Sequence, residues 1–383
     1  MAWIPNQMYV KRRNTLTVLN LIHQHQPISR TELTVLTDLS PASMTRIVNT
    51  LIHHQLVREE GVNDRVSRGR KQRLLYTCSD GLYAVGVYFE HNKLLVSLND
   101  FHRQCLHTVE RPLTDAGQFS ILHLAQLSRQ MLDSMDRALI PDWSKVRVAG
   151  ISVPGVVDSK RGVLLKSDQL HWQDVDLRSP FEQALGLPVW IENDAKACLL
   201  GEQARMNIPR QEDIAYLLVG AGVGIAVLSN GRLVRGHRNM AGEVEHLNLM
   251  PGLQSADVLQ THLTEHSILR SAQTASPSIR TLEDVMIAYR QNAGIARLLV
   301  EDILQYLRLV VSMIDCFYDP KRIVLGGEIF CKLQDALSPL LVDPRLSIGG
   351  DFEASCMVGA TIGAFDLALD TMLTDPEYGR TVV

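Results

Sequence analysis

The sequence predicts an α/β protein in which an N-terminal winged helix-turn-helix is followed by a larger body. Three observations support this fold class. The first 77 residues contain capped helical segments and a basic loop, apolar strands alternate with helical stretches from residue 83 onwards, and the charge is divided unevenly between the two parts. The length of 383 residues agrees with two or three domains.

The net charge of −4 conceals a segregation along the chain. Residues 1–77 contain 11 Lys and Arg against five Asp and Glu, which gives +6, whereas the remaining 306 residues carry −10. A basic module on an acidic body indicates a polyanionic partner for the first part only.

The overall composition excludes several classes of protein. Hydrophobic residues make up 46% and charged residues 21%, values of a folded globular chain rather than a disordered one. We find no apolar run of the roughly 18 residues that a membrane span needs and no signal-peptide pattern, so we expect a cytoplasmic protein. Six scattered cysteines without a C-x-x-C pair favour reduced thiols.

The first two helices are predicted by periodicity and by capping residues. Residues 14–25 place leucine and isoleucine at helical spacing, and a proline ends the segment. Ser29 followed by Glu32 forms a capping box that opens a second helix.

A third helix follows a short break and provides the candidate base-reading face. Ser40 is its expected cap, Pro41 occupies the first helical position, and the helix is expected to span residues 41–55. Two short helices, a tight turn and this third helix are the layout of a helix-turn-helix. The side chains assigned to base reading are Ser43, Thr45, Arg46 and Asn49.

A basic wing is predicted after the third helix. Strands are expected at 56–60 and 72–77, and the loop between them is rich in arginine. Any one arginine is most simply a solvated charge, but helix, turn, helix and basic loop in this order indicate DNA binding. The residues assigned to phosphate anchoring are Arg68, Arg70 and Lys71.

The body shows apolar strands that end in polar or glycine-rich turns. The expected strands are 83–89, 93–99, 147–153, 188–191, 214–219 and 321–325, with a helix at about 117–138. Their ends carry Pro154-Gly155, Asn193-Asp194, Gly220-Ala-Gly-Val-Gly224 and Gly326-Gly327. Open α/β sheets bind ligands at such strand ends.

These segments also carry a family resemblance. The stretches 151–158, 187–197, 220–224, 242–246, 325–328 and 358–365 resemble, in order and spacing, the motifs of the ROK family of repressors, open reading frames and kinases. The resemblance covers about residues 80–365, and the winged helix in front is typical of the repressor branch, which includes N-acetylglucosamine and glucose-pathway repressors.

The resemblance implies an actin-like, hexokinase-type body of two α/β lobes with a sugar in the cleft. In family kinases the aspartate at the position of Asp194 is the base that deprotonates a sugar hydroxyl, and Asn193 stands beside it. Carboxylate and amide groups also suit sugar hydroxyls on chemical grounds. The effector-binding residues expected from the resemblance and the strand ends are Pro154, Gly155, Asn193, Asp194, Glu243, His246 and Gln260.

Two departures from the family pattern argue against phosphoryl transfer. Residues 84–92 align with the kinase Asp-x-Gly-Gly-Thr loop but lack its aspartate and paired glycines, so backbone and magnesium contacts to phosphate are lost. In the second phosphate loop, Ala221 replaces a threonine and Ile225 a glycine. We therefore expect no catalytic residues, with Asp194 retained as a sugar-hydroxyl acceptor.

The family's zinc site is also missing from the sequence. Residues 247–262 contain no cysteine, although the family motif supplies three thiolates there. Gln260 replaces a sugar-binding glutamate, and Glu245 replaces a glycine before His246. We expect no metal and no cofactor.

The expected domains are a winged helix-turn-helix at 1–78, a first lobe at 79–191 completed by a C-terminal helix at 366–383, and a second lobe with a dimerisation surface at 192–365. The leading hypothesis is a transcriptional regulator, a repressor of carbohydrate genes, that binds double-stranded operator DNA and a sugar or sugar phosphate. We expect a homodimer or a dimer of dimers. The alternatives are a sugar kinase with an appended DNA-binding head and a repressor sequestered by a membrane sugar transporter.

Overall fold

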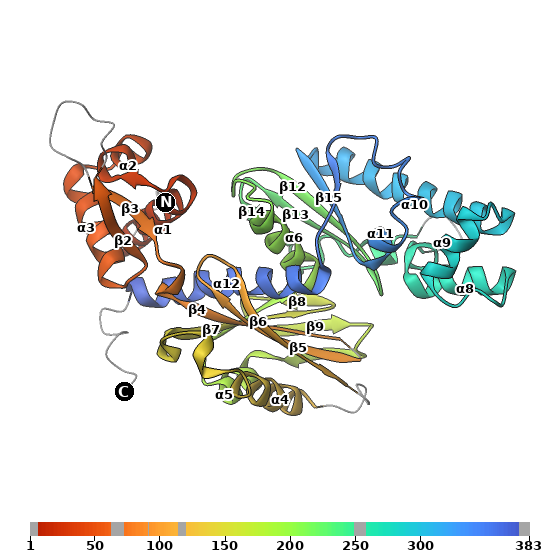
Figure 1. The fold of residues 1–383 in the computed structure, drawn as a ribbon, viewed down its shortest axis with the longest axis horizontal. Coiled ribbons are helices and arrows are strands. Elements are labelled where there is room, and N and C mark those ends of the chain that lie inside the picture. The colour runs from red at the N-terminus through yellow and green to blue at the C-terminus, as the bar shows by residue number, and fades with distance from the viewer. Residues whose placement is uncertain (1–6, 63–72, 91, 114–119, 249–257, 375–383) are drawn as a thin grey trace.

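The computed structural model describes residues 7–62, 73–90, 92–113, 120–248 and 258–374, and three parts are visible along its long axis (Figure 1). The N-terminal head lies at one end, a first α/β lobe occupies the middle, and a second lobe extends to the other end. The long C-terminal helix runs from the head along the sheet of the first lobe toward the second lobe.

The head is a three-helix unit with a small antiparallel sheet. Its elements are α1 (Gln7–His25), β1 (Ile28–Ser29), α2 (Arg30–Thr37), α3 (Pro41–His53), β2 (Val57–Val62) and β3 (Arg73–Thr77), with strand order β1-β3-β2. The predicted capping box is present: the Glu32 N–H donates to Ser29 Oγ at 3.2 Å, and the Ser29 N–H donates to the Glu32 carboxylate at 2.7 Å. Ser40 caps α3 through the N–H of Ser43.

The first lobe is built on a mixed five-stranded sheet of order β11-β7-β4-β5-β6. These strands are β4 (Tyr83–Phe89), β5 (Lys93–Asp100), β6 (Cys105–Pro112), β7 (Val146–Val153) and β11 (Val189–Asn193). β4, β7 and β11 are parallel, and β5 and β6 continue the sheet as antiparallel hairpins. A second small sheet contains β8 (Val156–Asp158), β9 (Val163–Ser167) and β10 (Trp172–Asp176), and helices α4 (Ile121–Asp133) and α5 (Arg178–Leu185) complete the lobe.

The second lobe repeats this plan with a five-stranded sheet of order β14-β13-β12-β15-β16. The strands are β12 (Ile214–Val219), β13 (Val223–Ser229), β14 (Arg232–Leu233), β15 (Arg322–Gly326) and β16 (Leu346–Ile348). The helices are α6 (Asp194–Arg205), α7 (Gln260–Leu263), α8 (Glu265–Ala275), α9 (Leu282–Arg290), α10 (Gly294–Tyr318) and α11 (Glu328–Lys332). Single 3-10 turns lie at Ser79–Gly81, Arg137–Leu139, Trp143–Lys145 and Val244–His246.

The C-terminal helix α12 (Phe352–Thr374) contacts all three parts. It packs against α6 and against β4, β7 and β11, and its distal half shares one apolar cluster with Val18, Leu19 and Ile22 of α1. Arg12 of α1 forms an ion pair with Asp370 of α12. The head is therefore attached to the body through α12.

The range expected for this helix, 366–383, is corrected by the structure. The helix already begins at Phe352, and residues 375–383 lie outside the described residues. The segment 352–365 lacks a polar face because it is buried against α6 and the sheet, and burial on several sides removes the helical periodicity that signals such a helix. By length and hydropathy α12 could cross a membrane, but most of it is buried within the described structure, as in the core helix of a folded domain.

Glycines allow α12 to approach its neighbours at backbone distance. A side chain at Gly359 would collide with the carbonyl oxygen of Ala197 in α6, and one at Gly150 of β7 would collide with the carbonyl of Ala360. The backbone at these positions cannot move away without shifting an entire helix or strand, so the contact requires glycine.

We predict that Gly359→Ala lowers the free energy of unfolding by about 3 kcal/mol, because the added methyl group overpacks the α6–α12 contact. The measurement is urea unfolding followed by circular dichroism and tryptophan fluorescence. Gly294→Ala, at a helical glycine with open space around it, is the matched control and should change stability by less than about 1 kcal/mol. Equal effects of the two substitutions would contradict this account of the packing.

Candidate functional site

The two parallel strands β7 and β11 bring the predicted effector residues of the first lobe together. Asn193 pairs in register with Val153, so Gly155 and Asn193 follow neighbouring strand ends. The side-chain amide of Asn193 donates to the carbonyl oxygen of Gly155 at 2.9 Å, and its Oδ1 accepts the N–H of Lys196 at the start of α6. Asn193 thus caps α6 and closes the end of the sheet.

Asp194 is buried at the first turn of α6, with 7% of its surface exposed. Its Oδ1 accepts hydrogen bonds from the side-chain amide of Asn193 and from the N–H of Ala195, both at 2.8 Å. Burial raises the pKa of Asp194 to about 7, and the negative charges of Glu243 and Glu245 contribute to the increase. A carboxyl group with this pKa can accept or donate a hydrogen bond near neutral pH.

The opposite wall of the cleft belongs to the second lobe. Glu243 lies 4.0 Å from the buried ammonium group of Lys196, so this pair links α6 to the segment before the 3-10 turn. Burial raises the pKa of Glu243 as well. Lys196 partly offsets the charge of these carboxyl groups.

Two further side chains cover the glycine loop between β12 and β13. Glu245 Oε2 accepts the N–H of Val223 at 3.4 Å. A side chain at Gly222 would meet this oxygen at 2.8 Å and Gln169 Nε2 at 2.9 Å, so both groups lie directly against the loop. The loop that the resemblance associates with phosphate is therefore faced by a carboxylate.

The cleft between these walls is narrow. Its cavity has a volume of about 40 Å³, far less than the several hundred Å³ of a typical ligand pocket. Of the expected effector residues, those that line it are Gly155, Asn193, Asp194 and Glu243. Sugar binding in this cleft requires the lobes to separate or the covering side chains to move.

The remaining expected effector residues lie at other positions. His246 is adjacent to the cleft, with Nε2 3.2 Å from Asp168 Oδ2. Pro154 is buried but does not line the cavity. Gln260 begins α7, where its carbonyl oxygen accepts the hydroxyls of Thr264 and Ser267, and it does not line the cavity either.

Among the lining residues that the sequence did not predict are Asp168 and Gln169. They follow β9, which belongs to the small sheet, and their only sequence signal is a short polar turn after an apolar strand. The sequence also did not predict Arg235, whose guanidinium reaches across from the second lobe to Glu192 of β11 with contacts of 2.8 and 2.5 Å. Glu192 is 1% exposed, so this pair is a buried link between the lobes.

One group of side chains in the described structure has metal-ligand character. Ligand atoms of Asp168, Glu245 and His246 all lie within 4.8 Å of one another. The set has two carboxylates and one imidazole, and no thiolate, so it does not match the cysteine-rich zinc site of the family.

The candidate DNA-binding face lies on α3. Arg46 is exposed, and in the described part of the chain no ion pair or side-chain hydrogen bond involves its guanidinium. Asn49 is also exposed, and its Oδ1 accepts a hydrogen bond from Arg30, which in turn pairs with Glu59. The hydroxyl of Thr45 donates to the carbonyl of Pro41.

Ser43 lies at the start of the same helix. Its backbone N–H is capped by Ser40, and the two serine hydroxyls are 3.0 Å apart. The three wing residues Arg68, Arg70 and Lys71 fall outside the described residues.

The fold and the site define a class of protein, and comparison with known families identifies it. The family model described as ROK family matches residues 93–340, and the chain belongs to this family. The model of the IclR helix-turn-helix domain matches residues 13–61. The predicted family and the two-part fold are confirmed.

Named relatives cover both parts of the chain. The xylose repressor of Caldicellulosiruptor bescii is 25% identical over 407 aligned residues, which cover 97% of this chain and 99% of that protein. The DNA-binding transcriptional dual regulator NagC of Escherichia coli is 24% identical and covers 86% of this chain and 83% of its own length. Both names describe regulators of transcription.

Solved structures show the same fold. A ROK-family transcriptional regulator described as a homologue of the E. coli MLC protein superposes with a TM-score of 0.75 at 21% identity, over 95% of this chain and 98% of its own. The ROK hexokinase of Thermus thermophilus superposes with a TM-score of 0.60 at 24% identity, over 75% of this chain and 99% of its own. The regulator matches nearly the whole chain, and the hexokinase matches three quarters of it.

We predict that Asp194→Asn stabilises the protein increasingly as pH rises from 5 to 8. Folding raises the pKa of this carboxyl group from 3.8 to about 7. The protonated group therefore stabilises the folded state, and this stabilisation is lost as the pH rises through the folded pKa. The gain should be about 3 kcal/mol larger at pH 8 than at pH 5, since each pKa unit crossed between pH 5 and the folded value of about 7 corresponds to about 1.4 kcal/mol. The measurement is urea unfolding at several pH values.

Asp284→Asn provides a control of opposite sign. Backbone N–H groups of Arg280 and Thr281 lower the pKa of Asp284, so its contribution is present above the unfolded value and is lost only in acid. Removing it should cost the same stability at pH 5 and at pH 8. A pH-independent effect of Asp194→Asn would contradict the assignment of a raised pKa to Asp194.

Proposed function

We propose that this protein is a cytoplasmic transcriptional repressor of carbohydrate uptake or utilisation genes, whose operator affinity responds to a sugar or sugar phosphate in the cleft between the lobes. The observation that carries the proposal is the physical connection of its two functional parts. A helix-turn-helix head is packed on α12, and the same helix contacts α6, the helix that begins at Asp194.

DNA binding rests on the head. Its sequence is basic within an acidic protein, and α3 presents Arg46 and Asn49 on an exposed face. Arginine and asparagine can each make paired hydrogen bonds to a base edge in the major groove. The acidic body repels DNA, so the charge segregation directs the duplex to the head.

Effector binding rests on the cleft. Asn193 and Asp194 offer an amide and a carboxyl group on strand and helix ends that packing holds in place. Because the cleft is nearly closed, a sugar can enter only if the lobes separate or the covering side chains move, and the proposed response uses lobe separation. Since α12 contacts both lobes and the head, that change reaches the DNA-binding surface, and the coupling acts equally in the reverse direction.

We infer that the cleft does not transfer phosphate. Glu245 faces the glycine loop, and its negative charge would repel the phosphates of a nucleotide. The segment aligned with the first kinase loop contains Tyr88 and Phe89, which are buried at the end of β4, and the chain turns at once into β5. The kinase alternative would require both features to rearrange.

A homodimer would present two heads to a two-fold symmetric operator. The second lobe offers an apolar face for this contact, because α10 exposes Leu298 and Phe317 by 67% and 71%. Ile295 and Leu309 lie at helical spacing along the same face. Protein sequestration by a membrane sugar transporter remains the alternative mode of control.

We predict that Arg46→Ala weakens binding to an operator about tenfold or more, because one good base contact contributes about 1–3 kcal/mol. The operator is a duplex selected by the wild-type protein from a random pool, and binding is measured by fluorescence anisotropy.

The double substitution Arg68→Ala and Arg70→Ala should weaken binding to all DNA sequences. It should also lower the slope of log affinity against log salt concentration by about two. Arg270→Ala, at an exposed site on α8, is the control, and an equal loss in it would refute the assignment.

We predict that Asp194→Ala removes the response to the effector sugar while leaving operator affinity in its absence unchanged within about twofold. A panel of sugars and sugar phosphates is titrated into the protein–operator complex.

When ATP is added together with the sugars, the wild-type protein should release no ADP. Release of ADP would favour the kinase alternative. If no member of the panel changes operator affinity, sequestration by a protein partner is the better account.

A further inference from the structure

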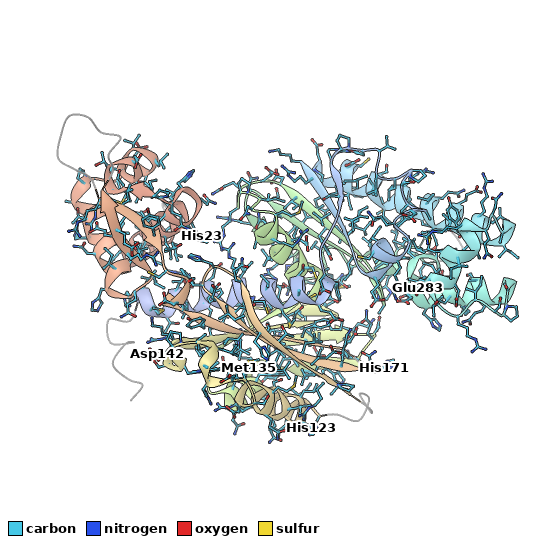
Figure 2. All side chains as sticks on the ribbon, viewed as in Figure 1. His23, His123, Met135, Asp142, His171 and Glu283 are labelled. Carbon is cyan, nitrogen blue, oxygen red and sulfur yellow. The ribbon has the colours of Figure 1, made fainter. Side chains whose placement is uncertain are left out.

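A cavity much larger than the cleft lies at the junction between the head and the body. Its volume is about 900 Å³, within the range of small-molecule sites. One wall is α1 of the head, another is the turn between β5 and β6 of the first lobe, and a third is the segment after α6 with the beginning of α12. Figure 2 shows His23 of α1 on the side of the head that faces the body.

Three arginines line this cavity, and they differ in their partners. Arg205 pairs with Glu202 through contacts of 3.0 and 2.6 Å, and Arg210 lies 3.5 Å from Asp366. The guanidinium of Arg103 has no ion pair or hydrogen bond with any residue that the structure describes, although it is half-buried. A guanidinium removed from water without hydrogen-bonded partners costs free energy unless an anion supplies the missing contacts, and Asp366 acts on Arg103 only through its charge.

Arg103 has both cationic and anionic neighbours. Burial and the charge of Arg210 lower the pKa of Arg103 to about 10, against the opposing charge of Asp366, so it stays protonated at neutral pH. Burial, with the charges of Arg103, His102 and Arg210, lowers the pKa of His23 to about 4. Asp351 also lines the cavity, but its carboxylate accepts the N–H of Ala354 at the start of α12.

We propose that this cavity binds a small phosphate-bearing metabolite, with Arg103 as its principal ligand and Arg210 as a second cationic contact. A planar guanidinium can donate two parallel hydrogen bonds to a phosphate group. The volume admits a phosphorylated sugar or a molecule of similar size.

The position of the cavity gives its occupant a regulatory role. A ligand held between α1, the β5–β6 turn and the segment after α6 contacts the head and both lobes at once. The ligand therefore favours the arrangement of head and body in which all three walls are close enough to contact it. This site is separate from the cleft at Asp194, and its binding can be measured without DNA.

The test is binding of inorganic phosphate and of glucose 6-phosphate to the full-length protein, measured by calorimetry and by ³¹P line broadening. Glucose serves as the uncharged counterpart. We expect saturable binding of the phosphate compounds, weakened about tenfold or more by Arg103→Gln, since each lost charge-assisted contact removes about this factor. The phosphate affinity of Arg103→Lys should lie between those of Arg103→Gln and the wild type, because lysine keeps the positive charge but lacks the planar guanidinium.

Three further variants make the outcome decisive. Arg270→Gln removes an exposed cation of the distant α8 and should not weaken phosphate binding. Arg210→Gln should weaken it, which keeps the proposal testable if Arg103→Gln does not fold. Using the Asp194→Ala protein separates this site from the cleft, because phosphate binding should persist in it.

The proposal is overturned if the wild-type protein binds neither phosphate compound, or if Arg103→Gln and Arg270→Gln bind them equally. Binding of glucose 6-phosphate without binding of inorganic phosphate identifies a phosphorylated sugar rather than free phosphate as the ligand. A protein that fails to bind any operator but still binds phosphate through Arg103 would refute the proposed function and leave this site intact.

Discussion

The packing of α12 against α6 and the first-lobe sheet is the contact on which the rest of the structure depends. It is made at backbone distance, through Gly359 on the helix and Gly150 on β7, and it places one rigid helix against the first lobe, α6 and the head. Because close-packed interfaces change between discrete arrangements rather than deform continuously, a movement of the lobes reaches α1 as a displacement of the whole helix. The ion pair between Arg235 and the buried Glu192 adds a second link between the lobes.

The electrostatics of the cleft separate this protein from a phosphate-transferring relative of the same fold. A kinase cleft must attract a polyanion. Here burial raises the pKa of Asp194, and the negative charges of Glu243 and Glu245 raise it further. Burial and the charge of Glu245 likewise raise the pKa of Glu243. Such a cleft suits neutral hydroxyl groups better than phosphates. The cationic groups lie instead at the junction of head and body, around Arg103. Neutral and anionic metabolites therefore contact different surfaces of the protein.

Much of the fold could be predicted from local chemistry. The Ser29–Glu32 capping box and the Ser40 cap each depend on residues three positions apart in the sequence. The strand ends near Gly155 and Asn193 are indicated by residue types with special backbone or hydrogen-bonding roles. The start of α12 could not be predicted, because a helix buried on several sides loses its periodicity. Gln169, Glu245 and Arg103 acquire their roles only through contacts between segments distant in the chain, and no spacing rule describes those contacts.

The position of α12 after its packing partners in the sequence has a consequence for how the protein is made. Ala84 and Val148 of the first sheet, and Ile22 of the head, are buried in one cluster with Phe365 and Leu369. During synthesis these apolar surfaces emerge long before their partner helix does, so they stay exposed until α12 has left the ribosome. A chain that stops short of α12 would have neither a closed first lobe nor a docked head, and would be a substrate for chaperones and proteases rather than a DNA-binding fragment.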